Sequence, residues 1–267
     1  MASLEINYPD VNRAFTSQST HFDADEQGNV VLADWRQKIY QHVEEFLLPK
    51  SSILELNAGT GTDAIHFTAA GHHVLATDMS GGMIQQLEEK AKGAVGLAVR
   101  ELSFENLDLL SGYKFDYVFS NFGGLNCTQD LSGVAKHLPP LLHSLAYITF
   151  VVMPPVCPWE WFWVLKCKWK DAFRRLPSGG AKASIDGIHF NVFYHSQSQI
   201  ARALGGSFKL VRAEGLGIFS PPPSAISFVR RYPRLARALQ RLDGLVQRRA
   251  PFNRCGDHLI LTYQYQP

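Results

Sequence analysis

One short stretch, SSILELNAGTGTDA at residues 51–64, restricts the possible folds more than any other part of the chain. Its apolar first half predicts a buried strand, and Thr62 and Asp63 suit the first turn of a helix. Between them, Gly59 and Gly61 let the backbone turn sharply and leave room for a ligand beside bare main chain. The stretch therefore predicts a strand, a glycine turn and a helix whose N-terminal N–H groups point at a ligand.

Strand and helix patterns alternate through the rest of the first 153 residues. Short apolar runs predict further strands at 73–78, 95–102, 115–120 and 146–153. Helical spacing predicts helices at 34–48, 62–70, 81–92 and 131–142. Residues 1–30 are polar with isolated aromatic residues, and they predict a loop and a short helix lying over other elements. Such alternation is typical of a parallel sheet with both faces covered by helices.

The alternation becomes irregular after residue 153. An aromatic helix that turns basic is expected over 159–175, a strand over 188–194 and a helix from Ser196 to residue 204. The last two strands are expected at 208–219 and 257–265. We expect a single domain over residues 1–267. Its predicted parts are N-terminal cap helices at 1–50, a core sheet at 51–153, 206–219 and 256–266, and lid insertions at 154–205 and 220–255.

Composition excludes some classes of protein. Hydrophobic residues make up 46% of the chain, which is ample for a sizeable core. The four cysteines are scattered without a CxxC pair, and no histidine cluster has metal-ligand spacing, so neither a metal site nor a disulfide framework is expected. No secretory signal is evident, and a cytoplasmic location is expected. Pro154, Pro155, Pro158 and Glu160 interrupt the apolar segment 138–165, which argues against a membrane span.

Charge is divided unevenly along the chain. Residues 1–150 hold 9 Lys and Arg against 18 Asp and Glu, whereas residues 151–267 hold 17 against 6. The second insertion carries five arginines on a helical segment with apolar residues between them: Arg230, Arg231, Arg234, Arg237 and Arg241. A lid helix with a solvated arginine face is the preferred interpretation. The alternative is an amphipathic helix that touches an anionic membrane and reaches a lipid-like acceptor.

Two acidic residues flank the glycine turn at the ends of adjacent predicted strands. Glu55 ends the first strand and Asp78 ends the second, so both face the crevice where parallel sheets bind ligands. A carboxylate at position 78 suits a ribose diol because it can accept two hydroxyl hydrogen bonds, and Met79 could pack on a purine.

The spacing Gly59-x-Gly61-x-x-Ala64 also fits a dinucleotide fingerprint, so an NAD(P)-dependent oxidoreductase is an alternative. Glu55 argues against this alternative, because a negative charge before the turn would repel a pyrophosphate and attract an amino group. S-adenosylmethionine carries an amino group, a ribose diol and an adenine, and it has no phosphate. It fits these residues better than NAD does.

The segments ELNAGTG at 55–61, ATDMS at 76–80 and FDYVFSN at 115–121 resemble those of class I S-adenosylmethionine-dependent methyltransferases. The resemblance covers roughly residues 32–153, with weaker support from the last two strands. It implies an α/β, Rossmann-like, doubly wound sheet of seven strands. Six strands would be parallel and one, in a C-terminal hairpin, antiparallel, with lid insertions after strands five and six.

The resemblance also implies site residues. Glu55 and the turn would hold the methionine part, Asp78 would bind the ribose hydroxyls, and Met79 would flank the adenine. The remaining cofactor residues that it implies are Asn57, Ala58, Gly59 and Gly61 in the turn, Ser103 and Phe104 near the adenine, and Asn121 and Phe122 beside the sulfonium. The chain departs from the family at Asn57, where a glycine is usual, and at Ser103, where an acid is usual. Asn tolerates unusual backbone angles, so neither departure removes the site.

The resemblance further implies transfer of a methyl group in line to an acceptor, and alignment alone can suffice for such a step. Asn126, Tyr194 and His195 are the candidates for facing the acceptor pocket. Whether O, N or C is methylated stays open, as does the oligomeric state. Because no base can be assigned, a non-catalytic sensor or scaffold that binds S-adenosylmethionine is a second alternative.

The acceptor is expected to be a small, apolar or aromatic molecule. Residues 121–124 lack the Asn-Pro-Pro-aromatic pattern of enzymes that methylate DNA bases, and few features resemble an RNA-binding module, so no nucleic-acid partner is expected. Aromatic residues of the two insertions are expected to offer stacking area for the acceptor: Trp159, Trp161, Trp163, Phe219 and Phe228.

Overall fold

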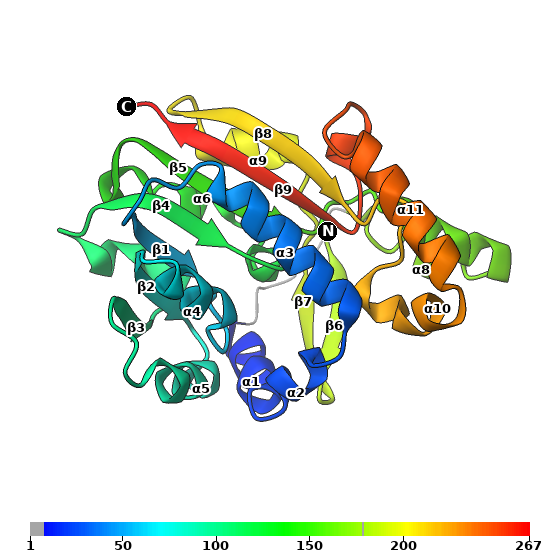
Figure 1. Cartoon of the computed structure of the whole chain (residues 1–267), viewed down its shortest axis with the longest axis horizontal. Helices are drawn as coiled ribbons and strands as arrows, with labels where there is room; N and C mark the ends of the chain where they lie inside the picture. The colour runs from blue at the N-terminus through cyan, green and yellow to red at the C-terminus, as the bar shows by residue number, and fades with distance from the viewer. Residues whose placement is uncertain (1–7, 178) are drawn as a thin grey trace.

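One seven-stranded sheet organises the computed structural model, which describes residues 8–177 and 179–267 (Figure 1). Its strands are β1 (Ser52–Leu56), β2 (His73–Asp78), β3 (Leu97–Glu101), β4 (Phe115–Ser120), β5 (Leu142–Val152), β8 (Phe208–Leu216) and β9 (His258–Tyr265). Their order is β3-β2-β1-β4-β5-β9-β8, and β9 runs antiparallel to both of its neighbours. The other pairs are parallel. The predicted sheet of six parallel strands and one antiparallel strand is confirmed.

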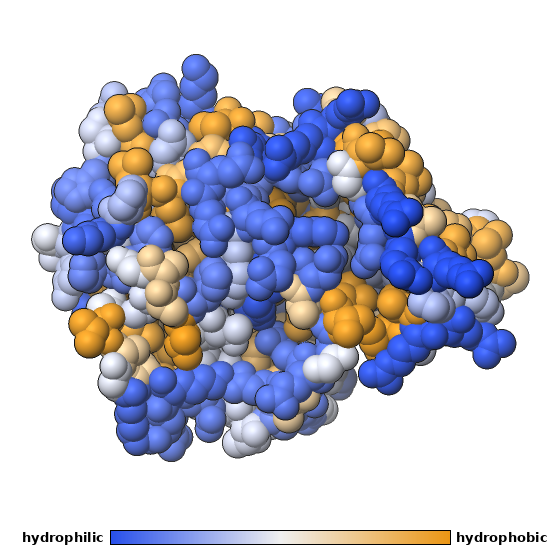
Figure 2. Space-filling model, viewed as in Figure 1, coloured by the Kyte–Doolittle hydropathy of each residue, from blue (hydrophilic) through white to orange (hydrophobic). Residues whose placement is uncertain are grey.

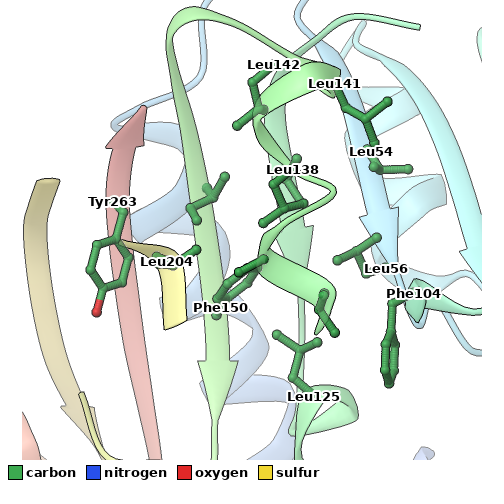
Figure 3. Close-up of a cluster of buried hydrophobic side chains, with 14 of the residues drawn as sticks. Leu54, Leu56, Phe104, Leu125, Leu138, Leu141, Leu142, Phe150, Leu204 and Tyr263 are labelled. Carbon is green, nitrogen blue, oxygen red and sulfur yellow. The ribbon is translucent and has the colours of Figure 1, made fainter. Parts of the chain in front are cut away.

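Helices cover both faces of the sheet. They are α3 (Val30–Glu44), α4 (Thr62–Ala69) and α5 (Gly81–Ala91), followed by the shorter α6 (Leu131–Ala135) and α9 (Gln197–Leu204). Side chains alternate along β1, so Leu54 and Leu56 join the apolar cluster of one face with Leu138 and Phe150 (Figure 3). Ile53 joins the cluster on the other face, which contains residues of α3, α4 and α5. This alternation also places Glu55 on the face of Ile53.

Serine caps begin two helices where the sequence predicts them. Ser80 Oγ accepts a hydrogen bond from Met83 N at 3.2 Å at the start of α5. Ser196 forms a capping box with Gln199 at the start of α9. Both helices therefore begin where a side-chain oxygen satisfies a backbone N–H that the helix itself leaves free.

Three predicted helices are wrong in extent. The helix expected over 34–48 is α3, which begins at Val30 after the Asn29 cap and ends at Glu44. The helix expected over 131–142 ends at Ala135, and a 3₁₀ turn, η3 (Pro139–Leu141), precedes β5, because Pro139 and Pro140 lack the N–H that a helix needs. The helix expected over 159–175 is three short pieces: α7 (Pro158–Trp161), η4 (Phe162–Lys166) and α8 (Trp169–Ala172). Cys167 has a φ of 55°, a left-handed conformation that interrupts the helix before α8.

The remaining elements gather at one end of the sheet. A hairpin of β6 (Ala181–Ile185) and β7 (Ile188–Val192) packs against α1 (Tyr8–Gln18), which is followed by α2 (Phe22–Glu26). The second insertion forms η5 (Pro223–Ala225), α10 (Ile226–Arg231), α11 (Pro233–Val246) and η6 (Phe252–Arg254). In Figure 1, α8, α10 and α11 lie together near the N-terminal end of β9. Among the helices of the described residues, none is long and apolar enough to cross a membrane.

Candidate active site

The glycine turn follows β1 as predicted and has the backbone shape that its residues suggest. Gly59 and Gly61 have φ angles of 56° and 84°, both in the region that favours glycine. A Cβ on Gly61 would lie 1.9 Å from Leu87 Cδ1, so close packing of the turn on α5 requires glycine there. A Cβ on Gly59 would meet no atom within 4 Å, so the main chain at this position faces open space.

Asp78 at the end of β2 is tied to the turn by backbone hydrogen bonds. Gly59 N donates to Asp78 Oδ2 at 2.9 Å, and Ser80 N donates to Asp78 Oδ1 at 2.8 Å. Burial raises the pKa of this carboxyl, and the backbone N–H groups partly oppose that shift. Each oxygen accepts one backbone N–H, so each keeps a lone pair for a further donor.

Asn57 stands where a glycine is usual, and the segment after the neighbouring strand β4 leaves room for its side chain. Its φ is 49°, and its Nδ2 donates to Ser120 Oγ at the end of β4, at 3.1 Å. A Cβ on Gly124 would lie only 2.0 Å from Asn57 Nδ2. The turn can therefore carry a side chain because the residue that faces it has none.

Glu55 lies beneath the turn and is 1% exposed. Its Oε2 has no hydrogen-bond partner within residues 8–177 and 179–267. Burial raises the pKa of this carboxyl well above its usual value, and the nearby Asp63 carboxylate raises it further, while the Arg36 guanidinium opposes both. The Glu55 carboxyl therefore lacks a counterion, and a cation bound above the turn would supply one.

A buried polar network joins the first turn of α4 to the end of β4. Asn121 Nδ2 donates to Asp63 Oδ2 at 2.8 Å, and Tyr40 OH donates to Asp63 Oδ1 at 2.6 Å. Arg36 of α3 forms ion pairs with Asp63 and with Glu26. Its guanidinium also lies 5.0 Å from the centre of the Phe122 ring. The network holds Asn121 and Phe122 at the carboxyl end of β4.

A cavity of about 510 Å³ runs along this edge of the sheet. Its size lies within the usual range of about 300–1,000 Å³ for small-molecule sites. Eight of the predicted cofactor residues line it: Asn57, Ala58, Gly59, Asp78, Met79, Phe104, Asn121 and Phe122. Glu55, Gly61 and Ser103 are not on its surface, and Ser103 Oγ instead accepts from Glu105 N at 3.3 Å.

An acid and a histidine lie next to each other in the wall of the cavity, near Phe122. His258 Nδ1 lies 2.9 Å from Asp257 Oδ2, and both residues line the cavity. The His258 ring packs edge-on against Phe122 and Trp35, with ring centres 5.8 and 5.9 Å apart. Although burial alone would raise it, the nearby His258 imidazole and the charge of Arg175 hold the pKa of Asp257 well below its usual range. The pair is therefore an ionised acid close to an imidazole whose Nδ1 makes no hydrogen bond of good geometry among the described residues.

Arg175 ties the first insertion to the start of β9. Its side chain is 3% exposed and donates to Glu160 Oε1 at 2.8 Å and to Asp257 Oδ1 at 2.6 Å. It also donates to the Asp257 carbonyl oxygen at 2.8 Å. Cys157, Glu160 and Asp257 place ligand-type atoms within 4.8 Å of one another, a spacing that could hold a metal ion. Arg175 pairs with both carboxylates of this group and Arg174 pairs with Glu160, so the cluster already has two cations for its two acids.

The structure does not bring Asn126, Tyr194 and His195 to the cavity surface. The Asn126 amide bonds to the backbone of Met153 and Phe193, and His195 Nε2 lies 2.9 Å from the Thr128 carbonyl oxygen. Burial lowers the pKa of His195 and raises that of Tyr194, whose ring lies under the Arg175 guanidinium. Asn126 and His195 instead tie the loop after β7 to the segments that follow β4 and β5, and Tyr194 packs on Arg175.

The expected stacking surface from the insertions is also not in the cavity. None of its five aromatic residues lines the cavity, and Trp161 and Trp163 are exposed. The aromatic wall comes instead from Phe15, Phe22, Phe122 and Phe190. Two of these belong to the N-terminal helices, as expected for a segment that lies over other elements.

The sequence analysis overlooked Arg36, Arg175, Asp257 and His258. One signal could have found the last two. In a sheet with one antiparallel strand, that strand begins at the edge where the parallel strands end, and Leu259 is indeed paired with Val152 at the end of β5. Polar residues just before the last strand therefore belong with those after β1, β2 and β4.

Comparison with known proteins identifies the fold and the domain. Residues 53–143 match a family model described as a methyltransferase domain. No curated protein matches the chain.

Solved structures with this fold are distant in sequence. The 1,6-didemethyltoxoflavin N1-methyltransferase of Burkholderia thailandensis, with bound 1,6-didemethyltoxoflavin and S-adenosylhomocysteine, has a TM-score of 0.61 at 14% identity, covering 100% of this chain and 92% of that one. A Listeria monocytogenes protein assigned as an S-adenosylmethionine-dependent methyltransferase has a TM-score of 0.60 at 15% identity, covering 90% and 100%. The CcbJ methyltransferase of Streptomyces caelestis has a TM-score of 0.56 at 15% identity, covering 84% and 87%.

The matched segment 53–143 contains the glycine turn, Asp78 and Asn121, which carry the resemblance in the sequence. It thus supplies most of one end of the cavity, and the sheet has the six parallel strands and one antiparallel strand that the resemblance implies. The match favours a methyltransferase over the oxidoreductase. Residues 53–143 form a methyltransferase domain, and the chain as a whole has the fold of S-adenosylmethionine-dependent methyltransferases.

Proposed function

We propose that the chain, acting as one catalytic unit over residues 1–267, methylates an O–H or N–H group of a small acceptor with an apolar or aromatic body. The observation that carries this proposal is the Asp257–His258 pair in the cavity that Gly59 and Asp78 also line. The wall of the cavity as a whole is largely apolar, with Phe22, Met153 and Pro222 among its residues. Such a wall suits an apolar body, and the imidazole suits an exchangeable proton.

The residues around the turn fit the cofactor. Main chain at Gly59 faces open space, the Asp78 oxygens keep lone pairs for two hydroxyl groups, and the buried Glu55 lacks a counterion that an amino group would supply. We therefore assign the methionine part to the turn from Asn57 to Gly61 and the ribose to Asp78. Met79 and Phe104 would flank the adenine, and Asn121 and Phe122 would lie beside the sulfonium. When bound, S-adenosylmethionine supplies an electrophilic methyl group on a positively charged sulfur.

His258 would hold the proton that the acceptor loses. The Asp257 carboxylate beside Nδ1 favours the tautomer with its proton on Nδ1, which leaves the Nε2 lone pair free. Nδ1 is buried and makes no hydrogen bond of good geometry among the described residues, so this preference comes from the carboxylate charge 2.9 Å away. As the acceptor oxygen or nitrogen forms its bond to the methyl carbon in line with the breaking bond to sulfur, its proton passes to Nε2. Cys127 lines the cavity too, but burial raises the pKa of its thiol to about 12, which disfavours a nucleophilic role.

The test is to incubate the protein with deuterated-methyl S-adenosylmethionine and a metabolite extract, and to identify labelled products by mass spectrometry. With the acceptor so found, His258→Gln should lower kcat about 100-fold, the usual contribution of a general base. Its affinity for S-adenosylhomocysteine should stay unchanged. His143→Gln, at an exposed position on β5, is the control.

A labelled macromolecule in place of a small product would refute the acceptor class. An unchanged kcat in folded His258→Gln would refute the role of His258 while leaving the acceptor class standing.

A further inference from the structure

Exposed apolar side chains concentrate on the two insertions. Among the described residues, 18 large hydrophobic side chains are exposed, and 11 of them lie within 161–176 and 232–245. The first segment contributes Trp161, Phe162, Trp163, Leu165, Trp169, Phe173 and Leu176, and the second contributes Tyr232, Leu235, Leu242 and Leu245. We call these residues and the arginines of α10 and α11 the insertion patch. Contiguous apolar surface of this kind marks an interaction site.

The two halves of the insertion patch belong to one surface. The Trp159 ring packs edge-on against Phe228 of α10, with centres 5.3 Å apart, and Phe228 in turn packs on Tyr232 at 5.2 Å. Figure 2 shows apolar residues alternating with strongly polar ones over the end of the molecule where Figure 1 places α8, α10 and α11.

The charge of the insertion patch has one sign. Five exposed arginines on α10 and α11 have no acidic partner within the described residues: Arg230, Arg231, Arg234, Arg237 and Arg241. The arginines near the sheet differ, because Arg36, Arg175, Arg212 and Arg248 all pair with acids. Residues 226–254 hold eight arginines and one acid, Asp243, which is buried and accepts hydrogen bonds from residues 218–220.

Helix α11 arranges the two kinds of side chain on neighbouring flanks. Arg234, Arg237 and Arg241 follow a spacing of three and four residues, which is one stripe of a helix. Leu235, Leu242 and Leu245 form the adjoining exposed stripe, while Ala236 and Asp243 face the protein. Basic residues beside leucine and tryptophan on an exposed helix are typical of segments that lie in the interface of a lipid bilayer.

We propose that the insertion patch docks on an anionic lipid surface, with its tryptophans and leucines in the headgroup region and its arginines on the lipid phosphates. Charge complementarity favours this occupant, because unpaired arginines next to exposed aromatic residues match an anionic headgroup layer over an apolar interior. The patch adjoins the cavity, since Arg174, Arg175 and Pro222 of the same insertions line it. Docking would therefore bring the cavity close to molecules dissolved in the bilayer.

Co-sedimentation of the full chain with vesicles tests the proposal without cofactor or acceptor, so its outcome does not depend on the proposed function. We expect binding to phosphatidylcholine vesicles that contain phosphatidylglycerol at low salt. Little binding is expected to phosphatidylcholine alone, and a blue shift of tryptophan fluorescence should accompany binding. The triple variant Arg234→Gln, Arg237→Gln, Arg241→Gln should bind at least about tenfold less, since each basic residue near such a surface contributes about fivefold.

The matched control removes three exposed charges elsewhere: Lys136→Gln, Arg202→Gln, Lys209→Gln. It should bind within about twofold of the unmodified chain if the patch makes the contact. Absence of binding at low salt would overturn the proposal, and so would equal losses in the two triple variants. A third outcome is a chain that does not bind vesicles but forms a dimer, which the double variant Trp161→Ser, Trp169→Ser dissociates. That outcome would assign the patch to contact with a second copy instead.

Discussion

The two ends of the cavity are constructed differently. The end that we assign to the cofactor comes from four short segments, each at or after the carboxyl end of a parallel strand, and backbone hydrogen bonds tie Asp78 to the turn. The end around His258 is assembled from α3, the first insertion and the start of β9, which are held together by buried ion pairs such as Arg175 with Asp257. Local backbone geometry shapes the first end, whereas long-range charge pairing shapes the second.

This difference predicts that the second end depends on single side chains. Arg175→Gln should lower the free energy of unfolding by about 3 kcal/mol, because it leaves the buried Asp257 carboxylate without its guanidinium partner and Glu160 paired only with Arg174. Chemical denaturation measures the loss, and calorimetry with S-adenosylhomocysteine should show cofactor affinity within about twofold of the unmodified protein.

Arg174→Gln is the matched control for this change. Arg174 also pairs with Glu160, but its side chain is 52% exposed, so the variant should lose less than about 1 kcal/mol. Equal stability of the two variants would show that Arg175 is not what holds this end together.

The first end should respond to crowding in the backbone. Gly124→Ala places a methyl group where Asn57 Nδ2 now lies, and we expect it to weaken S-adenosylhomocysteine binding by about 2 kcal/mol, near 30-fold. The double variant Asn57→Gly, Gly124→Ala removes the clash and should recover most of the affinity, as calorimetry would show. If the second substitution rescues nothing, the contact between the two residues does not shape the turn.

Glu55 gives the smallest expected effect, and a pH dependence. Because the pKa of Glu55 is raised in the folded state, the folded protein binds its proton more tightly than the unfolded chain does. Stability therefore falls as pH rises from the ordinary glutamate pKa towards the raised value, and the full cost is present above that value. Glu55→Gln removes the cost and should be more stable by about 1 kcal/mol in alkaline buffer, with no gain below the ordinary glutamate pKa.

Unfolding curves at several pH values check this expectation. Gln cannot supply a negative charge, so the same variant should bind S-adenosylhomocysteine more weakly above the raised pKa, where Glu55 is ionised. Stability that rises with pH in the unmodified chain relative to Glu55→Gln would contradict a buried, uncompensated carboxyl.

Prediction from sequence succeeded where neighbouring residues determine the structure. The bounds of β2 and β4, the caps at Ser80 and Ser196 and the turn around Gly59 all follow from local patterns. It failed at Arg36 and Arg175, because nothing near them in the chain reveals that Asp63 and Asp257 will be their partners. Histidine shows the same limit, since His195 and His258 differ only in what the fold places beside them.

The exchange between Asn57 and Gly124 has a consequence for recognising related proteins. The side chain of Asn57 fills the space that Gly124, 67 residues away, leaves empty. The two positions are therefore linked, although neither is informative alone. In an alignment of relatives, a side chain at the first position should coincide with glycine at the second. A search pattern that demands glycine at the first would discard such proteins, whereas one that scores the two columns jointly would keep them.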